Sequence, residues 1–428
     1  MELNQLYQLY LKCNGICTDT RKIGGGEMFF ALKGPNFNAN KLALTALANG
    51  CAYAVVDELL EEENGRLIKV DDALATLQQL ANFHRRQFDI PVIGITGSNG
   101  KTTNKELINS VLSKKYRVHC TKGNLNNHIG VPLTLLELNS SHEITIIEMG
   151  ANHVGEIKEL SEIAEPTHGL ITSIGIAHLE GFGSVEGIKK GKKELYDYVL
   201  KHNGICFVNQ HTSVVPDLYE GGESNVFYYG NSSHLPYVVI GQSKPTLSLE
   251  AITSHGSFKI ASNLIGEFQS NNILNAFAIG DYFKVEEASI VEAIEAYHPK
   301  NNRSQQMEWN SNLVILDAYN ANPTSMEAAI HSFVSSDAHN KVVIIGDMLE
   351  LGEASLDYHQ KIVEQLKDHS FDQVILVGSE FMKTEIPDHF VPFEGTQSAK
   401  AFVKDQNYQQ KTILVKGSRG IGLEKIFD

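Results

Sequence analysis

Apolar residues in this chain fall into short runs separated by polar and helical segments, a pattern typical of strands buried in α/β domains. In the first part of the chain such runs occupy residues 28–32, 52–56 and 67–70, with helical patterns between and after them. The Asp-Ile-Pro sequence at 89–91 then interrupts the pattern. We therefore predict a small α/β domain over residues 1–87.

The same alternation predicts two further α/β domains, over residues 88–298 and 299–428. In the middle domain each apolar strand ends in a polar cluster, as expected for a mostly parallel sheet flanked by helices. We predict a Rossmann-like fold for the last domain, with strands at 313–316, 341–345, 373–377 and 412–415. It has no G-x-G-x-x-G, which argues against a dinucleotide ligand.

Composition narrows the range of partners. A chain of 428 residues is too long for one core, and a formal charge of −15 argues against a nucleic-acid or anionic-membrane surface. The five cysteines form no C-x-x-C pair, and we expect them to be reduced thiols of a cytoplasmic protein. No apolar run reaches the length of a membrane span. We therefore expect small-molecule substrates, no nucleic acid and no membrane insertion.

The most informative segment is residues 93–103, an Ile-rich run followed by G-S-N-G-K-T-T. It predicts a strand, a phosphate-binding loop and a helix: Gly97 and Gly100 allow backbone N–H groups to face phosphate oxygens, Lys101 adds a charge, and the Thr102 hydroxyl suits Mg²⁺. A second predicted strand, 144–147, ends at Glu148, the carboxylate expected to bind Mg²⁺ beside such a loop. We therefore expect the middle domain to resemble nucleotide triphosphatases with a phosphate loop (P-loop NTPase-like).

The loop, without the first glycine of the common G-x-x-x-x-G-K-[ST] motif, resembles the Mur ligase and folylpolyglutamate synthase superfamily. Further motifs of the Mur ligases are matched across all three predicted domains, at residues 18–21 (T-D-T-R), 29–34 (F-F-A-L-K-G), 124–132 (N-L-N-N-H-I-G-V-P), 177–184 (A-H-L-E-G-F-G-S), 266–272 (G-E-F-Q-S-N-N), 302–303 (N-R), 317–323 (D-A-Y-N-A-N-P), 346–352 (G-D-M-L-E-L-G) and 416–419 (K-G-S-R). One departure is Gln269, which stands where the family usually has asparagine in its adenine-side motif.

The resemblance implies an ATP-dependent amide ligase of peptidoglycan precursor synthesis, with D-alanyl-D-alanine and UDP-N-acetylmuramoyl-tripeptide as substrates and an acyl phosphate as intermediate. It implies catalytic roles for Lys101, Glu148, His178 and Lys192, and two Mg²⁺ ions held by Thr102, Glu148, His178 and Lys192. Lys192 falls at the position of a carbamylated lysine in the family, whereas its lysine-rich helix alone would indicate a solvated face.

The resemblance also distributes residues among the three substrates, and because family members are usually monomers, we expect a monomer. The residues expected at ATP are Gly97, Ser98, Asn99, Gly100, Lys101, Thr102, Thr103, Asn272, Arg303 and Asp317. Those expected at the UDP-sugar and its peptide are Thr20, Arg21, Lys33, Asn124, Asn126 and Asn127. Those expected on the D-alanyl-D-alanine side are Tyr319, Asn320, Asn322 and Lys416.

Three other functions compete with this interpretation. A folylpolyglutamate synthase is disfavoured because the motifs at 18–21 and 124–127 belong to the nucleotide-sugar side of the Mur ligases. A non-catalytic scaffold that evolved from a ligase would be expected to lack one of Lys101, Glu148, His178 and Lys192, but all four residues are present. A kinase or GTPase with a phosphate loop would be expected to have a Walker-type loop or guanine-reading motifs, and neither is found.

Overall fold

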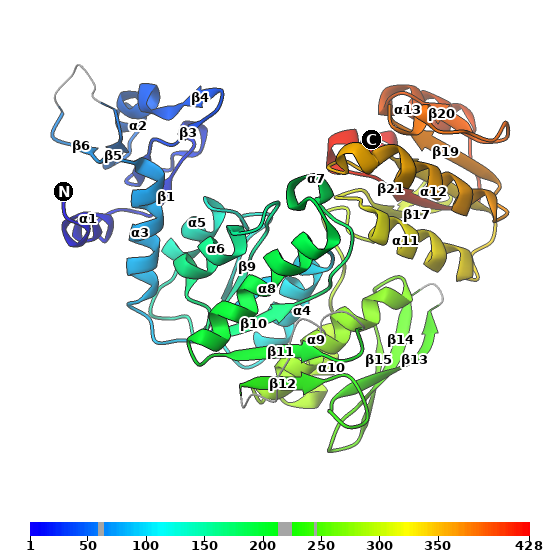
Figure 1. The fold of residues 1–428 in the computed structure, drawn as a ribbon, viewed down its shortest axis with the longest axis horizontal. Coiled ribbons are helices and arrows are strands. Elements are labelled where there is room, and N and C mark those ends of the chain that lie inside the picture. The colour runs from blue at the N-terminus through cyan, green and yellow to red at the C-terminus, as the bar shows by residue number, and fades with distance from the viewer. Residues whose placement is uncertain (59–63, 213–224, 244–245) are drawn as a thin grey trace.

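A computed structural model describes residues 1–58, 64–212, 225–243 and 246–428 of the chain, and its sheets are of the α/β type predicted (Figure 1). In Figure 1 the N-terminal and C-terminal units lie at opposite ends of a central unit. The predicted boundaries fall between sheets: 87/88 lies between α3 (Ala73–Arg85) and β7 (Val92–Thr96), and 298/299 lies between α10 (Glu287–Glu295) and β16 (Gln305–Trp309).

The N-terminal unit is built on a parallel sheet with the strand order β1-β2-β5-β6. Its elements are α1 (Leu3–Tyr10), β1 (Ile16–Cys17), β2 (Met28–Phe30), the hairpin β3 (Lys33–Gly34) and β4 (Phe37–Asn38), α2 (Ala43–Ala48), β5 (Tyr53–Val56), β6 (Leu67–Lys69) and α3. The three predicted strands are present, and β1 is an additional short one. Its core is continuous with that of the central unit, because α3 packs against α5 (Gly130–Leu136) and α6 (Glu156–Ala164), and Tyr10 of α1 donates a hydrogen bond to Leu136 O.

The central unit contains a parallel sheet with the order β12-β11-β10-β7-β9-β8. Its strands are β7, β8 (Val118–Cys120), β9 (Ile144–Glu148), β10 (His168–Ile171), β11 (Ile205–Asn209) and β12 (Val226–Tyr229). Alternate residues of a strand face opposite sides of its sheet. Ile93 and Ile146 accordingly pack with α4 (Lys101–Leu112) and α9 (Ser270–Tyr282), whereas Val92 and Ile147 face α6 and α8 (Val185–Lys201).

The β-rich stretch of the central unit divides between two sheets, which the sequence pattern did not anticipate. Strands β11 and β12 extend the parallel sheet, whereas β13 (Tyr237–Ser243), β14 (Leu247–Ile252) and β15 (Ser257–Ala261) form an antiparallel sheet of their own. This small sheet shares its core with α9 and α10.

The C-terminal unit has the sheet order β16-β17-β21-β18-β19-β20, in which β16 runs antiparallel to its neighbour and the other pairs are parallel. The remaining strands are β17 (Asn312–Asp317), β18 (Lys341–Gly346), β19 (Gln373–Val377), β20 (Val391–Phe393) and β21 (Thr412–Lys416). Helices α11 (Pro323–Ser335) and α12 (Ser355–Lys367) cover one face, and α13 (Thr396–Asp405) covers the other. Across the described ranges, none of the helices combines the length and apolarity that crossing a bilayer requires.

A buried network of amide side chains joins α4, α9 and the parallel sheet. Asn275 on α9 donates to Asn104 Oδ1 (2.9 Å) and accepts hydrogen bonds from Asn209 Nδ2 (2.9 Å) and Tyr229 Oη (2.7 Å). Asn104 also donates to Asn272 Oδ1 (2.6 Å). Because buried polar groups are costly when they are unpaired, the network fixes α9 against the helix that follows the predicted phosphate loop.

Replacement of Asn275 by alanine should therefore lower the free energy of unfolding by about 2 to 4 kcal/mol, since three buried partners lose a hydrogen bond. Thermal unfolding followed by circular dichroism measures the effect. The matched control is Asn109→Ala at a half-exposed position of α4, which we expect to change stability by less than about 0.5 kcal/mol. Equal midpoints for the two variants would contradict the structural role of the network.

Candidate active site

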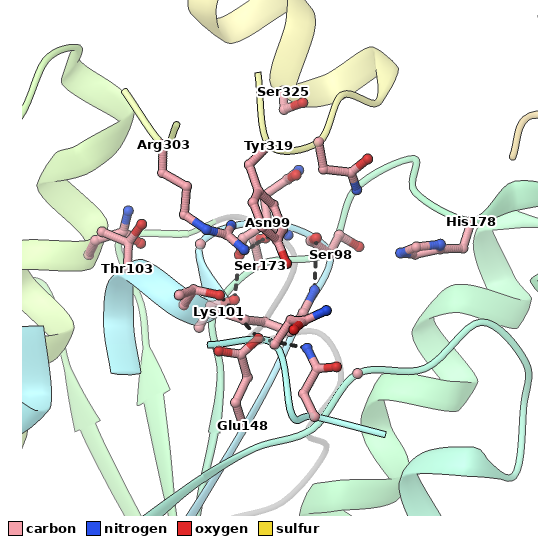
Figure 2. Close-up of a pocket in the computed structure, with 18 of the residues that line it drawn as sticks. Ser98, Asn99, Lys101, Thr103, Glu148, Ser173, His178, Arg303, Tyr319 and Ser325 are labelled. Carbon is pink, nitrogen blue, oxygen red and sulfur yellow. Dashed lines mark hydrogen bonds between the residues drawn. The ribbon is translucent and has the colours of Figure 1, made fainter. Parts of the chain in front are cut away.

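A cavity of about 610 Å³ opens where the carboxyl ends of the central strands face the C-terminal unit (Figure 2). Of the residues predicted to bind ligands, it is lined by Ser98, Asn99, Gly100, Lys101, Thr102, Thr103, Asn124, Asn126, Asn127, Glu148, His178, Asn272, Arg303, Asp317, Tyr319, Asn320 and Lys416. Residues from all three predicted substrate groups therefore meet at one cavity, although they are dispersed over more than 300 positions in the chain.

The predicted phosphate loop connects β7 to α4, and its two glycines are required by its geometry. Gly97 has a φ of 147°, and a Cβ atom there would lie 2.1 Å from Thr172 Oγ1. Gly100 has a φ of 79°, and a Cβ atom there would lie 2.7 Å from Asn272 Oδ1. Both positions combine a positive φ with a close neighbour, so only glycine fits.

Lys101 is the first residue of α4, and its side chain folds back over the loop. Its Nζ donates to the backbone oxygens of Gly97 (2.7 Å) and Ser98 (3.2 Å). Burial lowers the pKa of Lys101 to about 8; Glu148 opposes this shift and Arg303 adds to it. The ammonium group is thus held against the backbone of the loop, at the edge of the cavity that the loop lines.

The segment after β10 supports the loop, a role that the sequence analysis did not assign. Ser173 Oγ accepts from Asn99 N–H (2.9 Å), Thr172 Oγ1 donates to Asn99 O (2.6 Å), and Ser98 N–H donates to Ser173 O (2.9 Å). The signal was present in the sequence, because Thr172 and Ser173 directly follow an apolar strand at the edge where parallel strands meet ligands.

Glu148 lies beside the loop because β9 is the neighbour of β7, with Ile95 and Glu148 in register. Its Oε1 accepts hydrogen bonds from Thr102 Oγ1 (3.1 Å) and Asn126 Nδ2 (2.8 Å). Its Oε2 is buried and makes no hydrogen bond within the described part of the chain. A carboxylate oxygen that accepts no hydrogen bond, next to a threonine hydroxyl, is a donor set that fits Mg²⁺, which binds few protein oxygens and fills its shell with water and phosphate.

The other two predicted metal ligands have different partners in this arrangement. His178, with a φ of 54°, lies away from Glu148 in Figure 2, and its Nδ1 is 2.5 Å from Glu350 Oε2 of the C-terminal unit. The described residues contain no group of three His, Cys, Asp or Glu side chains that could hold a metal ion. The pair of Thr102 and Glu148 is therefore assembled, whereas a second metal site with His178 is not.

Lys192 on α8 is 1% exposed, so the lysine-rich face of this helix is not uniformly solvated. Its Nζ donates to Ala151 O (3.3 Å) and lies 4.9 Å from the centre of the Phe182 ring. Burial, reinforced by the charge of Lys101, lowers the pKa of Lys192 well below its usual value. Lys192 does not line the cavity, but its hydrogen-bond partner Ala151 does.

The C-terminal unit contributes the opposite wall of the cavity. Strands β17 and β21 place Asp317 and Lys416 in register at their ends, and the two side chains form an ion pair of 2.5 Å. The guanidinium of Arg303 stacks 3.7 Å from the centre of the Tyr319 ring, and that of Arg419 lies 5.5 Å from the same ring. The sequence analysis did not name Arg419 or Glu350 as site residues, although both fall within the motifs it recognised.

Asn322 bridges the two walls. Its Nδ2 donates to Asn99 Oδ1 of the phosphate loop (2.8 Å), and its Oδ1 accepts from Ser325 N–H (2.9 Å) as the N-cap of α11. Ile176 N–H, which follows the supporting segment, likewise donates to Thr324 Oγ1 (2.9 Å). In this arrangement Asn322, predicted on the acceptor side, holds the C-terminal unit against the loop.

Two further predicted contacts have partly structural roles. Asn272 donates to the buried Gln269 Oε1 (2.6 Å), so the residue that departs from the family pattern orients the one that matches it. Asn127 Oδ1 accepts from the backbone N–H groups of Ile129 (3.1 Å) and Gly130 (2.9 Å) at the start of α5.

Three predicted residues lie on the N-terminal unit and do not line the cavity. Thr20 and Arg21 belong to a short 3₁₀ helix, where the exposed Arg21 pairs with Asp19 (2.8 Å). Lys33 Nζ lies 3.2 Å from Asp57 and 3.6 Å from Glu58. Only a ligand that extends from the central cavity to the N-terminal unit could contact both groups.

Comparisons with known proteins match both the sequence and the fold. Residues 95–280 match the family described as Mur ligase middle domain, and residues 302–419 match that described as Mur ligase, glutamate ligase domain. Over 426 residues the chain is 34% identical to the UDP-N-acetylmuramoyl-tripeptide–D-alanyl-D-alanine ligase of Bacillus subtilis (strain 168), covering 96% of this chain and 92% of that protein.

Solved structures of proteins named as Mur ligases are also similar to this chain in fold. A crystal structure of MurF from Acinetobacter baumannii has a TM-score of 0.88 and 31% identity, covering 99% of this chain and 97% of that one. The fold is also shared with MurF ligase from Thermotoga maritima, solved in complex with ADP, with a TM-score of 0.84 and 24% identity over 97% of this chain and 96% of that one. The predicted three-domain α/β fold is confirmed by these matches.

Replacement of Gly97 by alanine should weaken the binding of ADP by roughly 30-fold to 150-fold, because backbone strain and the contact with Thr172 together cost about 2 to 3 kcal/mol. Isothermal titration calorimetry measures the dissociation constant. The matched control is Gly256→Ala, since Gly256 has a similar φ of 144° but nothing within 4 Å of a Cβ atom. ADP affinity should be unchanged in the control, and wild-type affinity in Gly97→Ala would show that the loop does not hold phosphate.

Proposed function

The chain belongs to the Mur ligase family, and we propose that it joins D-alanyl-D-alanine to UDP-N-acetylmuramoyl-tripeptide with conversion of ATP to ADP and phosphate. The observation that carries this proposal is the cavity in which the phosphate loop with Lys101 and the carboxylate of Glu148 face Arg303 and Tyr319 of the C-terminal unit. The names of the relatives support the choice of substrates, and the family's amide-forming chemistry fits the charges of the site.

An amide does not form between a carboxylate and an amine in water, so the carboxylate must first be activated. We propose that a terminal oxygen of the tripeptide carboxylate attacks the γ-phosphorus of ATP, that the bond to the bridging oxygen breaks, and that ADP leaves. The amine of D-alanyl-D-alanine then attacks the acyl carbon of the acyl phosphate, and phosphate leaves as the amide forms. The ammonium group of the incoming dipeptide loses two of its three protons in the course of this reaction, one before the attack and one as the amide forms, and the third remains as the amide N–H.

The residues of the phosphate loop act in the first step, the transfer of the γ-phosphoryl group. Lys101 would exchange its bonds to Gly97 O and Ser98 O for the phosphate oxygens, and the backbone amides of residues 97–101 would bind the same group. Arg303 is positioned to add a second cation from the C-terminal side, since its charge already lowers the pKa of Lys101. Preorganised positive charge at the transferring phosphoryl group is the main source of catalysis in such reactions.

Thr102 and Glu148 are proposed to hold Mg²⁺, with Glu148 Oε2, which accepts no hydrogen bond from the described residues, as the carboxylate ligand. When bound, Mg²⁺ supplies electrostatic stabilisation of the phosphate oxygens. His178 would join such a site only after leaving Glu350, so the two-ion arrangement requires a conformation of this segment other than the one described here.

Carbamylation of Lys192 is also part of the proposal. Burial favours the neutral amine, the form that attacks CO₂, and the product is a carbamate with loss of one proton. The more exposed lysines of α8 lack this environment.

The three units are proposed to divide the substrates among them. Thr20, Arg21 and Lys33 would hold the diphosphate of the nucleotide-sugar, whose peptide extends to Asn124 and Asn126 at the cavity. Tyr319, Asn320 and Lys416 would receive D-alanyl-D-alanine. The contacts of the C-terminal unit with the loop and with His178 would close the site and exclude water from the acyl phosphate. We propose a cytoplasmic monomer, in keeping with five free cysteines.

Phosphate release provides the test. Phosphate should be released by the unmodified protein only when ATP, the tripeptide substrate and D-alanyl-D-alanine are all present, and tripeptides that differ at residue three identify the preferred tripeptide. Release with a folate and glutamate, or without any peptide, would overturn the assignment.

Lys101→Ala should lower the rate of ligation at least about 1,000-fold without unfolding the protein, because the transferring phosphoryl group loses its main protein cation. Circular dichroism and phosphate release should be measured on the same preparation. Lys115→Ala, at an exposed lysine after the same helix, is the control and should be fully active. A folded Lys101→Ala protein with near-normal turnover is the contrary result.

Lys192→Ala should be nearly inactive, and a small carboxylic acid added to the assay should restore part of the rate by replacing the carbamate. Lys190→Ala and Lys193→Ala on the same helix are the controls and should retain most of the activity. Full activity of Lys192→Ala in buffer depleted of CO₂ would show that this lysine serves only the packing of α8.

A further inference from the structure

Lys105 is a buried lysine that the reaction described above does not use. It lies on α4, one helical turn after Lys101, and is 2% exposed. Its Nζ is 3.8 Å from Glu148 Oε2 and 3.4 Å from the backbone oxygen of Gly123. The sequence analysis gave Lys105 no role.

The two oxygens of Glu148 have different surroundings. Oε1 accepts hydrogen bonds from the neutral groups of Thr102 and Asn126. Oε2 faces the ammonium of Lys105 but forms no hydrogen bond with any described residue. The oxygen that is free to bind a cation is therefore the one already opposed by a built-in positive charge.

Lys105 and Glu148 also hold the segment that carries Asn126. Lys105 contacts Gly123 O, Asn126 donates to Glu148, and the backbone N–H of Glu148 donates to Thr121 Oγ1 (3.0 Å). Residues 121–126 are thus fastened to α4 and to the end of β9 around one carboxylate, which limits how far Glu148 can move.

A buried carboxylate that has lost its cationic partner is strongly destabilised, and it attracts any available cation. With Lys105 in place, Glu148 and Lys105 together carry no net charge. A divalent cation therefore gains little binding free energy at this neutral pair, unless the phosphates of a nucleotide add negative charge and further oxygen ligands.

We propose that Lys105 is a positioning residue that neutralises Glu148 in the nucleotide-free protein, so that a divalent cation binds at Glu148 only together with nucleotide phosphates. The inference rests on the proposed function only in assigning Glu148 to the divalent ion, and it is independent of the identity of the peptide substrates. Its consequence is that the metal enters with ATP instead of occupying the site beforehand.

Binding of Mn²⁺ to the nucleotide-free protein, measured by electron paramagnetic resonance of the free ion, tests the proposal. Lys105→Met keeps the length of the side chain but removes its charge, and it should bind Mn²⁺ at Glu148 at least about tenfold more tightly than the wild type. Lys105→Arg should stay close to the wild type. Lys114→Met, which removes a more exposed lysine of the same helix region, is the matched control and should leave Mn²⁺ binding unchanged.

Thermal unfolding in EDTA gives a second measurement that needs no substrate. Lys105→Met should unfold at a lower temperature than the wild type, because Glu148 is left unpaired. The double variant Lys105→Met/Glu148→Gln should recover most of that loss and show no tight Mn²⁺ site.

A folded Lys105→Met protein with wild-type Mn²⁺ affinity would overturn the inference, and so would a double variant as unstable as the single one. Neither readout involves ligation, so a wild-type protein that fails to release phosphate while Lys105→Met gains Mn²⁺ affinity would refute the proposed function alone.

Discussion

Hydrogen bonds between the phosphate loop and the segment after β10 are the constraint on which the site depends. The loop leaves β7 and must turn its amides toward the cavity, and Thr172 and Ser173 hold it there through Asn99 and Ser98. The contact is so close that position 97 has no room for a side chain. Because β10 is the neighbour of β7 in the sheet, this support follows from the strand order.

The same loop fixes the position of the C-terminal unit. Asn322, the N-cap of α11, donates a hydrogen bond to Asn99. Thr324 accepts a hydrogen bond from Ile176, which lies just beyond the supporting segment. A third contact, between His178 and Glu350, lies further along the same stretch of chain. The phosphate loop and the domain that carries Arg303 and Tyr319 are therefore joined through shared hydrogen-bonded groups, so a movement of the loop would act directly on that domain.

Charge in the site is arranged differently from charge on the whole chain. The protein carries a formal charge of −15, yet the site holds Lys101 and Lys105, and Lys192 lies behind its lining residue Ala151. Burial lowers the pKa of Lys101 to about 8, so its charge is costly to keep until an anion arrives, whereas burial of Lys192 favours the neutral amine that the proposed carbamylation requires. A site of this kind is prepared for a polyphosphate and a carboxylate, and the ion pair between Lys105 and Glu148 limits the cost in their absence.

The sequence alone determined the class of fold, the three units and the position of the loop between β7 and α4, because buried strands, turn-forming glycines and helical periodicity leave local signals. It also located Glu148, since a carboxylate that ends an apolar strand next to a phosphate loop is well placed to bind Mg²⁺. Only the tertiary structure decided which distant side chains meet. The partnerships of Asn322 with Asn99, of Glu350 with His178 and of Lys105 with Glu148 depend on strand order and domain position, and no local pattern encodes them. The lysine-rich helix shows the same limit: Lys192 is buried against Ala151 and Phe182 whereas Lys190 is exposed, and only the tertiary packing of α8 makes that distinction.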